Sequence, residues 1–258
     1  MTTKKEITHN WLQRYTGRKI KSFTPYILIT NFQYYLELFA EMENADIVGL
    51  DKAMPSVSAN NITLINFGMG SPNAATIMDL LSAISPKAVL FLGKCGGLKK
   101  KNKLGDLIIP LAAIRNEGTS NDYLPTEVPA LPAFSLQKAV SEVILENARD
   151  YWTGVVFTTN RRVWEYDEKF KDYLITTRAM AIDMETATIF TVGFANSIPT
   201  GALLLVSDQP MISTGIKTDA SDKKVTVEFV EQHLRIGIDS LKEISNGGKS
   251  VKHLLFDN

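Results

Sequence analysis

The feature that most constrains the fold is a recurring short apolar segment, each copy followed by a helical pattern. Residues 200–206 (TGALLLV) are almost wholly apolar, which is typical of a parallel strand buried on both faces. Residues 26–30 and 87–92 have the same character, and amphipathic helical patterns lie between these segments. This alternation predicts a single α/β domain whose central sheet is mostly parallel or mixed and is flanked by helices.

The composition argues against several classes of function. Lys+Arg and Asp+Glu balance at 28 each, so the chain lacks the basic excess that is typical of nucleic-acid-binding proteins. One cysteine excludes an internal disulfide, and the three histidines lack the spacing of metal ligands, so we expect no metal and no cofactor. The N-terminus has no signal-like apolar core and no segment reaches membrane length, so we expect a cytoplasmic protein without a membrane partner.

The stretch AIDMETAT at residues 181–188 joins a predicted strand, 179–183, to a predicted helix, 185–194. Met184 and Glu185 therefore stand where a strand gives way to a helix, which is where open α/β sheets bind ligands. A carboxylate there can accept hydrogen bonds from both hydroxyls of a ribose, and a methionine offers the sugar an apolar surface. The alternative is that Glu185 only complements the helix dipole.

Two glycine-containing segments follow other predicted strands. In residues 68–73 (GMGSPN), Gly70 lets the backbone come close to a ligand, and we expect Ser71 to cap the next helix. Residues 93–98 (GKCGGL) are expected to form a turn whose free N–H groups hold an anion, and Lys94 within it favours phosphate. A tight bend without any ligand is the alternative for this turn.

Polar residues also follow the predicted strands at 154–159 and 200–206. Arg161 and Arg162 are suited to holding a phosphate, and Trp164 is suited to stacking on a base. The alternatives are surface ion pairs for the arginines and a core position for the tryptophan. Asp208, after the strand at 200–206, suits acid–base chemistry or recognition of a base edge, and the alternative is a cap or loop role.

Several of these motifs together resemble the purine nucleoside phosphorylase and uridine phosphorylase family. They are GMGS at 68–71, GKCGG at 93–97, Met184-Glu185 and Ser207-Asp208. Within that family, further stretches resemble the catalytic domains of AMP nucleosidases. They are TNFQ at 30–33, EGTSNDYLP at 117–125 and GIKT at 215–218.

The resemblance implies a domain organisation and an assembly. It implies a nucleoside phosphorylase-like catalytic domain over residues 26–246, after an N-terminal arm or helix at 1–25 and before a C-terminal tail at 247–258. Longer members carry a separate regulatory domain, for which this chain is expected to be too short. The family also implies a homo-oligomer, with a hexamer favoured.

The resemblance further implies residue roles. Glu185 would bind the ribose hydroxyls while Met184 packs on the sugar, and Asp208 would protonate or hydrogen-bond N7 of the departing purine. Trp164 falls near the base-stacking aromatic of the family. The other expected substrate-binding residues are Asn31, Gly70, Ser71, Lys94, Gly96, Arg161, Arg162 and Ser207.

The departures from the family pattern concern the nucleophile. The G-D-P-x-R turn of the phosphorylases is replaced by TNFQY at 30–34, and an arginine near the second glycine motif is replaced by Phe91. The arginines that clamp a phosphate nucleophile are therefore missing, and we expect attack by water. Lys94, Arg161 and Arg162 then become candidates for binding the 5′-phosphate of the substrate. The glutamate that activates water in hydrolytic relatives has no counterpart after the first strand.

The resulting hypothesis is hydrolysis of AMP to adenine and ribose 5-phosphate, with inorganic phosphate as a modulator. One alternative is a purine nucleoside phosphorylase with a rearranged phosphate site. The other is a non-catalytic nucleotide-binding or sensor protein on the same fold. The retention of both Glu185 and Asp208 disfavours the sensor.

Overall fold

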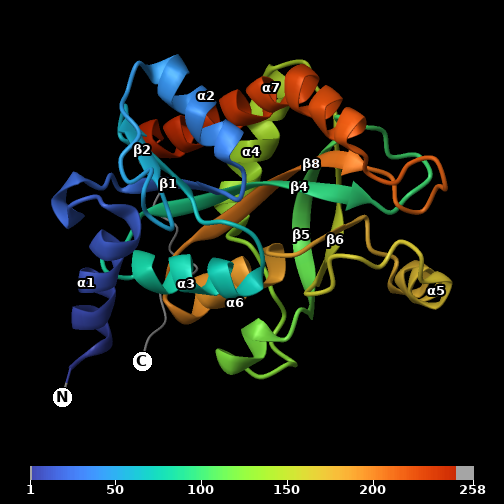
Figure 1. The fold of residues 1–258 in the computed structure, drawn as a ribbon, viewed down its shortest axis with the longest axis horizontal. Helices are drawn as coiled ribbons and strands as arrows, with labels where there is room; N and C mark the ends of the chain where they lie inside the picture. Colours follow the sequence, from blue (N-terminus) through green and yellow to red (C-terminus); the bar gives the residue numbers. More distant parts are fainter. Residues whose placement is uncertain (1, 248–258) are drawn as a thin grey trace.

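The computed structural model describes residues 2–247, and its centre is an eight-stranded mixed sheet in the order β2-β3-β1-β4-β7-β6-β5-β8 (Figure 1). The strands are β1 (Tyr26–Thr30), β2 (Ser56–Ala59), β3 (Ile62–Asn66), β4 (Ala88–Gly97), β5 (Leu107–Asn116), β6 (Tyr151–Thr159), β7 (Ala181–Asp183) and β8 (Thr200–Asp208). The apolar segments at 26–30 and 200–206 are central strands, as predicted. Of the expected C-terminal tail at 247–258, residues 248–258 lie outside the described residues.

Strand β4 organises the sheet because it pairs with three other strands. It runs parallel to β1 and β8 and antiparallel to β7. Since β8 also pairs with β5, and β5 with β6, the strands β4, β7, β6, β5 and β8 close on one another. The mixed sheet of the prediction is confirmed, and its second half is a closed, barrel-like unit.

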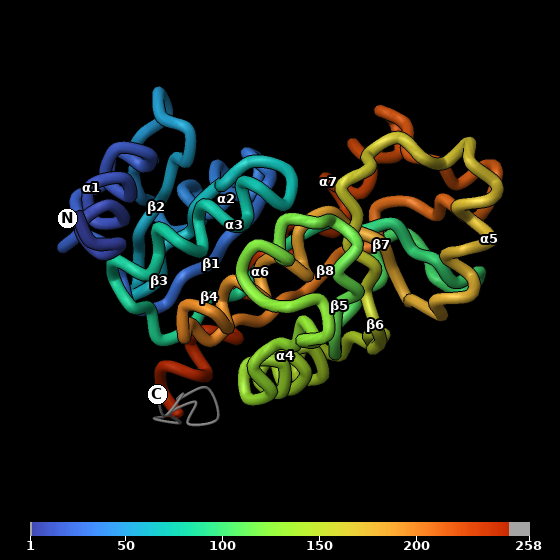
Figure 2. The backbone as a smooth tube through the Cα atoms, turned by 90° about the horizontal axis from the view of Figure 1, so that it is seen from below, coloured from blue at the N-terminus to red at the C-terminus, as the bar shows by residue number. Residues whose placement is uncertain are grey.

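Helices cover both faces of the sheet (Figure 1). One apolar layer lies under α1, α3 and α6, and a second lies under α2, α4 and α7. The helices are α1 (Lys4–Thr16), α2 (Gln33–Glu43), α3 (Ser71–Leu81), α4 (Phe134–Glu146), α5 (Glu168–Thr177), α6 (Thr186–Ala195) and α7 (Asp219–Asn246), with short 3-10 helices η1 (Ile20–Ser22) and η2 (Thr119–Asp122). Figure 2 shows α5 at the far end of the molecule from α1. Within residues 2–247, none of the helices is long and apolar enough to span a membrane.

The glycine-rich segment at 93–98 differs from the prediction, because β4 continues through it to Gly97. Its backbone pairs with β8 as far as Gly96 and with β7 at Gly96 and Gly97. A Cβ atom at Gly93 would lie 2.4 Å from Cζ of Phe91, and one at Gly97 would lie 2.8 Å from Cβ of Asn102. The glycines therefore make room for neighbouring side chains, and the prediction of a turn with free N–H groups is wrong.

The long loop after β5 packs against α3 and α6, where η2 contacts both helices. Arg115 shapes it by donating to the carbonyl oxygens of Ser120, Leu124, Pro125 and Val128. The loop thus braces the two helices that begin beside the pocket described below.

Asp79 on α3 ties this loop to the rest of that face. It accepts hydrogen bonds from Nζ of Lys4 at 2.7 Å, Oη of Tyr123 at 2.7 Å and Nδ2 of Asn196 at 3.0 Å. These donors come from α1, from the loop and from the end of α6. One carboxylate therefore fastens three separate segments to α3.

Replacing Asp79 with alanine is expected to lower the free energy of unfolding by roughly 1–3 kcal/mol, because three donors lose a charged acceptor. Urea denaturation of the full chain measures the change, with Asp122→Ala as control because Asp122 is an exposed aspartate in η2. Equal unfolding free energies for the two variants would contradict this role of Asp79.

Candidate active site

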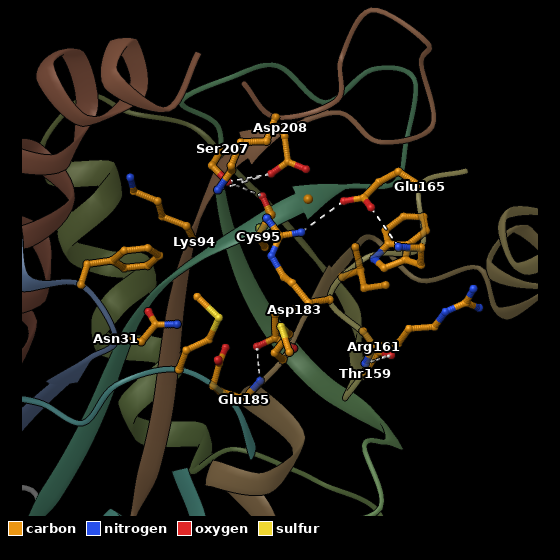
Figure 3. Close-up of a pocket in the computed structure, with 18 residues that line it drawn as sticks. Asn31, Lys94, Cys95, Thr159, Arg161, Glu165, Asp183, Glu185, Ser207 and Asp208 are labelled. Atoms are coloured by element: carbon orange, nitrogen blue, oxygen red, sulfur yellow. Dashed lines mark hydrogen bonds and ion pairs between the residues drawn. The ribbon is translucent and has the colours of Figure 1, made fainter. Parts of the chain in front are cut away.

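A pocket opens at the sheet edge where β1, β6, β7 and β8 end (Figure 3). Among residues 2–247, its lining takes in each predicted site residue other than Gly70 and Ser71. The predicted residues that line it are Asn31, Lys94, Gly96, Arg161, Arg162, Trp164, Met184, Glu185, Ser207 and Asp208. The carboxyl ends of neighbouring strands do converge on one site, as the strand-end argument predicted. Within the same described residues, no group of three or more histidine, cysteine or acidic side chains is placed to hold a metal ion.

Glu185 occupies the cap position of α6, but its side chain turns toward the pocket wall. Its Oε1 accepts the backbone N–H of Gly70 at 2.7 Å. Asp183 serves the start of the helix instead, accepting from the backbone N–H of Thr186 at 2.8 Å and from its Oγ1 at 2.5 Å. The geometry therefore does not match the alternative in which Glu185 only complements α6. Asp183 is a site residue that sequence reasoning missed.

Gly70 and Ser71 lie outside the pocket lining, but they hydrogen-bond to the lining residues Glu185 and Met184. Ser71 is the first residue of α3 and Gly70 precedes it in the cap position, so the prediction that Ser71 caps the helix is wrong by one residue. Gly70 has a φ of +94°, a conformation that glycine adopts without strain. Ser71 Oγ donates to the carbonyl oxygen of Met184 at 2.5 Å. These residues fix the turn at Met184 and Glu185.

Burial and the nearby Asp183 raise the pKa of Glu185 to about 8. The N–H groups of Gly70 and Met184 and the side chain of Asn31 act in the opposite direction. Burial also raises the pKa of Asp183, but its carboxylate accepts four hydrogen bonds from Thr158, Glu185 and Thr186. We therefore assign the negative charge of this pair to Asp183 and the proton to Glu185 at neutral pH.

Asp208, at the end of β8, faces a lysine that sequence reasoning did not select. Its Oδ1 accepts a hydrogen bond from Oγ of Ser207 at 2.8 Å and lies 3.8 Å from Nζ of Lys217. Lys217 also lines the pocket. The stretch GIKT at 215–218, which carries part of the family resemblance, is the sequence signal that could have identified this lysine.

Lys94 lines the pocket, and its side chain is only 4 % exposed. Its Nζ donates to Oδ1 of Asp222 at 3.0 Å and to Oγ1 of Thr226 at 2.9 Å, and lies 4.8 Å from the ring centroid of Phe32. Burial lowers the pKa of Lys94, and the hydrogen bond to Asp222 acts against that shift.

The arginines after β6 make local ion pairs. Nη1 of Arg161 lies 2.7 Å from Oδ2 of Asp167, and Figure 3 shows its side chain directed away from Glu185 and Asp208. Nη1 of Arg162 lies 3.3 Å from Oε1 of Glu165. These pairings match the surface alternative, so the phosphate role of both arginines stays a prediction.

Trp164 is both a pocket residue and a core residue. It is 4 % exposed, and its ring packs edge-on against Phe170 at 5.4 Å between centroids. It belongs to a small apolar cluster with Phe157 and Leu174. Trp164 therefore occupies a core position, which was the alternative, and its stacking on a base stays a prediction.

Comparison with known proteins shows the family. The pattern described as "Phosphorylase superfamily" matches residues 25–245. The chain belongs to the phosphorylase superfamily. This confirms the resemblance seen in the sequence and the nucleoside phosphorylase-like fold.

Members of the superfamily differ in their similarity to the chain. The AMP nucleosidase of Escherichia coli K12 is 29% identical over 89% of this chain, which spans only 57% of that relative's length. A guanosine phosphorylase of Halorubrum lacusprofundi is 24% identical over 77% of the chain and 85% of its own length.

Solved structures of an AMP nucleosidase and of a uridine phosphorylase share this fold. The crystal structure of an AMP nucleosidase from Bacteroides thetaiotaomicron superposes with a TM-score of 0.87 at 59% identity, covering 95% of this chain and 99% of that one. A uridine phosphorylase from Vibrio fischeri superposes with a TM-score of 0.76 at 21% identity, covering 87% and 94%. The second likeness shows the fold alone.

Proposed function

We propose that the chain hydrolyses the N-glycosidic bond of AMP, releasing adenine and ribose 5-phosphate. The observation that carries the proposal is that a single pocket joins the buried acid Glu185, the strand-end acid Asp208 and the lysines Lys94 and Lys217. Figure 3 shows the first three of these side chains. These groups complement a ribose, a purine and a phosphate in turn. The 59% identity to an AMP nucleosidase supports the choice of AMP.

The ribose is assigned to Glu185 and Asn31. Protonated Glu185 presents one donor and one acceptor to neighbouring hydroxyls. Oδ1 of Asn31 is buried and has no hydrogen-bond partner among residues 2–247, so it is free to accept from a sugar hydroxyl. Met184 lines the same part of the pocket and supplies apolar contact. This corner holds the sugar while the bond to the base breaks.

The base is assigned to Asp208. Cleavage of the bond leaves negative charge on the purine and positive charge on the ribose, so the catalyst must deliver a proton or a strong hydrogen bond to N7. Asp208 is the last residue of β8, and Oγ of Ser207 donates a hydrogen bond to one of its carboxylate oxygens. Release of the Glu185 proton to solvent water would leave a carboxylate that stabilises the cationic ribose.

The 5′-phosphate is assigned to Lys94 and Lys217. Both lysines line the pocket and both lie within 3.5 Å of Asp222, so they share one corner. The arginines Arg161 and Arg162 also line the pocket, but they are ion-paired with Asp167 and Glu165. A phosphate needs cationic donors, and this corner supplies two.

Water is the proposed nucleophile. Tyr34, shortly after β1, and Phe91 in β4 stand at the positions where the resemblance places arginines in phosphorylases. We assign inorganic phosphate a modulating role through the same lysine corner. We also propose a cytoplasmic homo-oligomer, with a hexamer favoured, as the family implies.

Identification of both products tests the reaction. The protein is incubated with AMP in phosphate-free and in phosphate-containing buffer, and the products are separated by chromatography. Adenine and ribose 5-phosphate in both buffers support hydrolysis. A doubly phosphorylated ribose that forms only with phosphate would favour the phosphorylase alternative, and AMP binding without cleavage would favour the sensor.

A further inference from the structure

One carboxylate oxygen faces both lysines of the pocket corner. Oδ1 of Asp222, in the first turn of α7, lies 3.0 Å from Nζ of Lys94 and 3.5 Å from Nζ of Lys217. The two lysines come from distant parts of the chain, β4 and the loop before α7. Asp222 is thus the group on which their positive charges converge.

This contact differs from an ordinary surface ion pair. The Lys94 side chain is nearly inaccessible, and Asp222 and Thr226, its two hydrogen-bond acceptors, both lie on α7. Lys217 adds a like charge that lowers the pKa of Lys94, whereas Asp222 raises it. The carboxylate therefore offsets a repulsion that a bound anion would offset equally well.

We propose that Asp222 is an internal competitor for the substrate's phosphate group. In the free protein it holds the two lysines, and a phosphate group binds by taking them over from the carboxylate. The choice of AMP rests on the function proposed above, but the competition itself requires only that a phosphate group binds to Lys94 and Lys217.

The competition makes the corner selective for phosphate-bearing ligands. A phosphate monoester carries about −1.5 to −2 charges at pH 7, against −1 for the carboxylate, and offers three acceptor oxygens. A ligand without phosphate leaves the ion pairs of Asp222 intact. Asp222 thereby sets the affinity for the phosphate group without contributing to that of the nucleoside portion.

Titration calorimetry with ribose 5-phosphate and with inorganic phosphate tests the competition. Asp222→Asn is expected to bind ribose 5-phosphate about tenfold more tightly than the unaltered protein, because the competing charge is gone. Asp219→Asn is the matched control: it removes the same charge from the first turn of α7, where Asp219 is 85 % exposed and pairs with Lys223. The control is expected to stay within about twofold. Adenosine, measured in parallel, is expected to bind all three proteins alike.

Unchanged or weaker binding of ribose 5-phosphate by Asp222→Asn, with a normal control, would overturn the proposal, because Asp222 would then be orienting the lysines. The capping box of Thr218 and Ser221 is untouched by the substitution. If the variant does not fold, binding of ribose 5-phosphate is measured with Asp222→Ser, which also removes the charge and tests the same competition.

The binding assay also separates this inference from the proposed function. Tighter phosphate binding by Asp222→Asn in a protein that does not cleave AMP would leave the competition standing and refute the activity. Cleavage of AMP without tighter phosphate binding by Asp222→Asn would support the activity and refute the competition.

Discussion

Replacing Asp208 with asparagine is expected to slow adenine release from AMP by at least about 100-fold, because general acid catalysis contributes 100-fold or more and an amide cannot deliver the proton. The substitution keeps the size of the side chain and its contact with Ser207. Binding of AMP and the unfolding temperature are therefore expected to stay close to those of the unaltered protein. The rate is measured from adenine formed at saturating AMP.

The control for this experiment is Asp219→Asn, which removes an exposed aspartate outside the pocket lining. It is expected to turn over AMP at the normal rate. Near-normal turnover by Asp208→Asn would remove Asp208 from the role of acid and would turn attention to Lys217, 3.8 Å away.

Replacing Glu185 with glutamine is expected to have opposite effects on activity and stability. Turnover should fall by about 100-fold or more, because glutamine cannot ionise to stabilise a cationic ribose. Stability should rise at alkaline pH, because Glu185 is a buried acid that the fold keeps protonated. A substitution that disables the site while stabilising the protein is expected where a functional group is kept in an unfavourable environment, as the buried Glu185 is.

The pH dependence gives the sign of the stability effect. Folding raises the pKa of Glu185 from 4.5 to about 8, so the folded state keeps a proton that the unfolded state loses over that range. The stabilising contribution is complete at low pH and is lost as pH rises through about 8. Glutamine removes this dependence, so the variant should be more stable by several kcal/mol, on the order of 4, at pH 8 and similar near pH 4.

Urea denaturation between pH 4 and pH 8.5 tests this prediction. A difference between Glu185→Gln and the unaltered protein that grows with pH supports the assignment of the proton to Glu185. A difference that is constant with pH, or that shrinks as pH rises, would show that Glu185 is ionised in the free protein.

The core of the fold and the main site acids could be predicted because their signals are local. A strand buried on both faces needs apolar residues throughout, so the segment ending at Asp208 stands out in the sequence. Since ligands in such folds bind at the carboxyl ends of strands, Glu185 and Asp208 could be brought together without knowing any distance.

The rest depended on contacts between distant segments. The glycines from Gly93 to Gly97 look like a turn until β7 and β8, which come much later in the chain, pair with them. Asp183 becomes a site residue only because Glu185 turns away from α6 to meet Gly70. Helix α5 was not anticipated, and the convergence of Lys94 and Lys217 on Asp222 has no local pattern.

The most direct test of the account is the rate of adenine release from AMP and from adenosine in phosphate-free buffer. We expect release from AMP and little or none from adenosine, because the lysine corner at Lys94 and Lys217 suits a phosphate group. Release from adenosine that requires added phosphate, with AMP left intact, would contradict both the water nucleophile and the assignment of that corner.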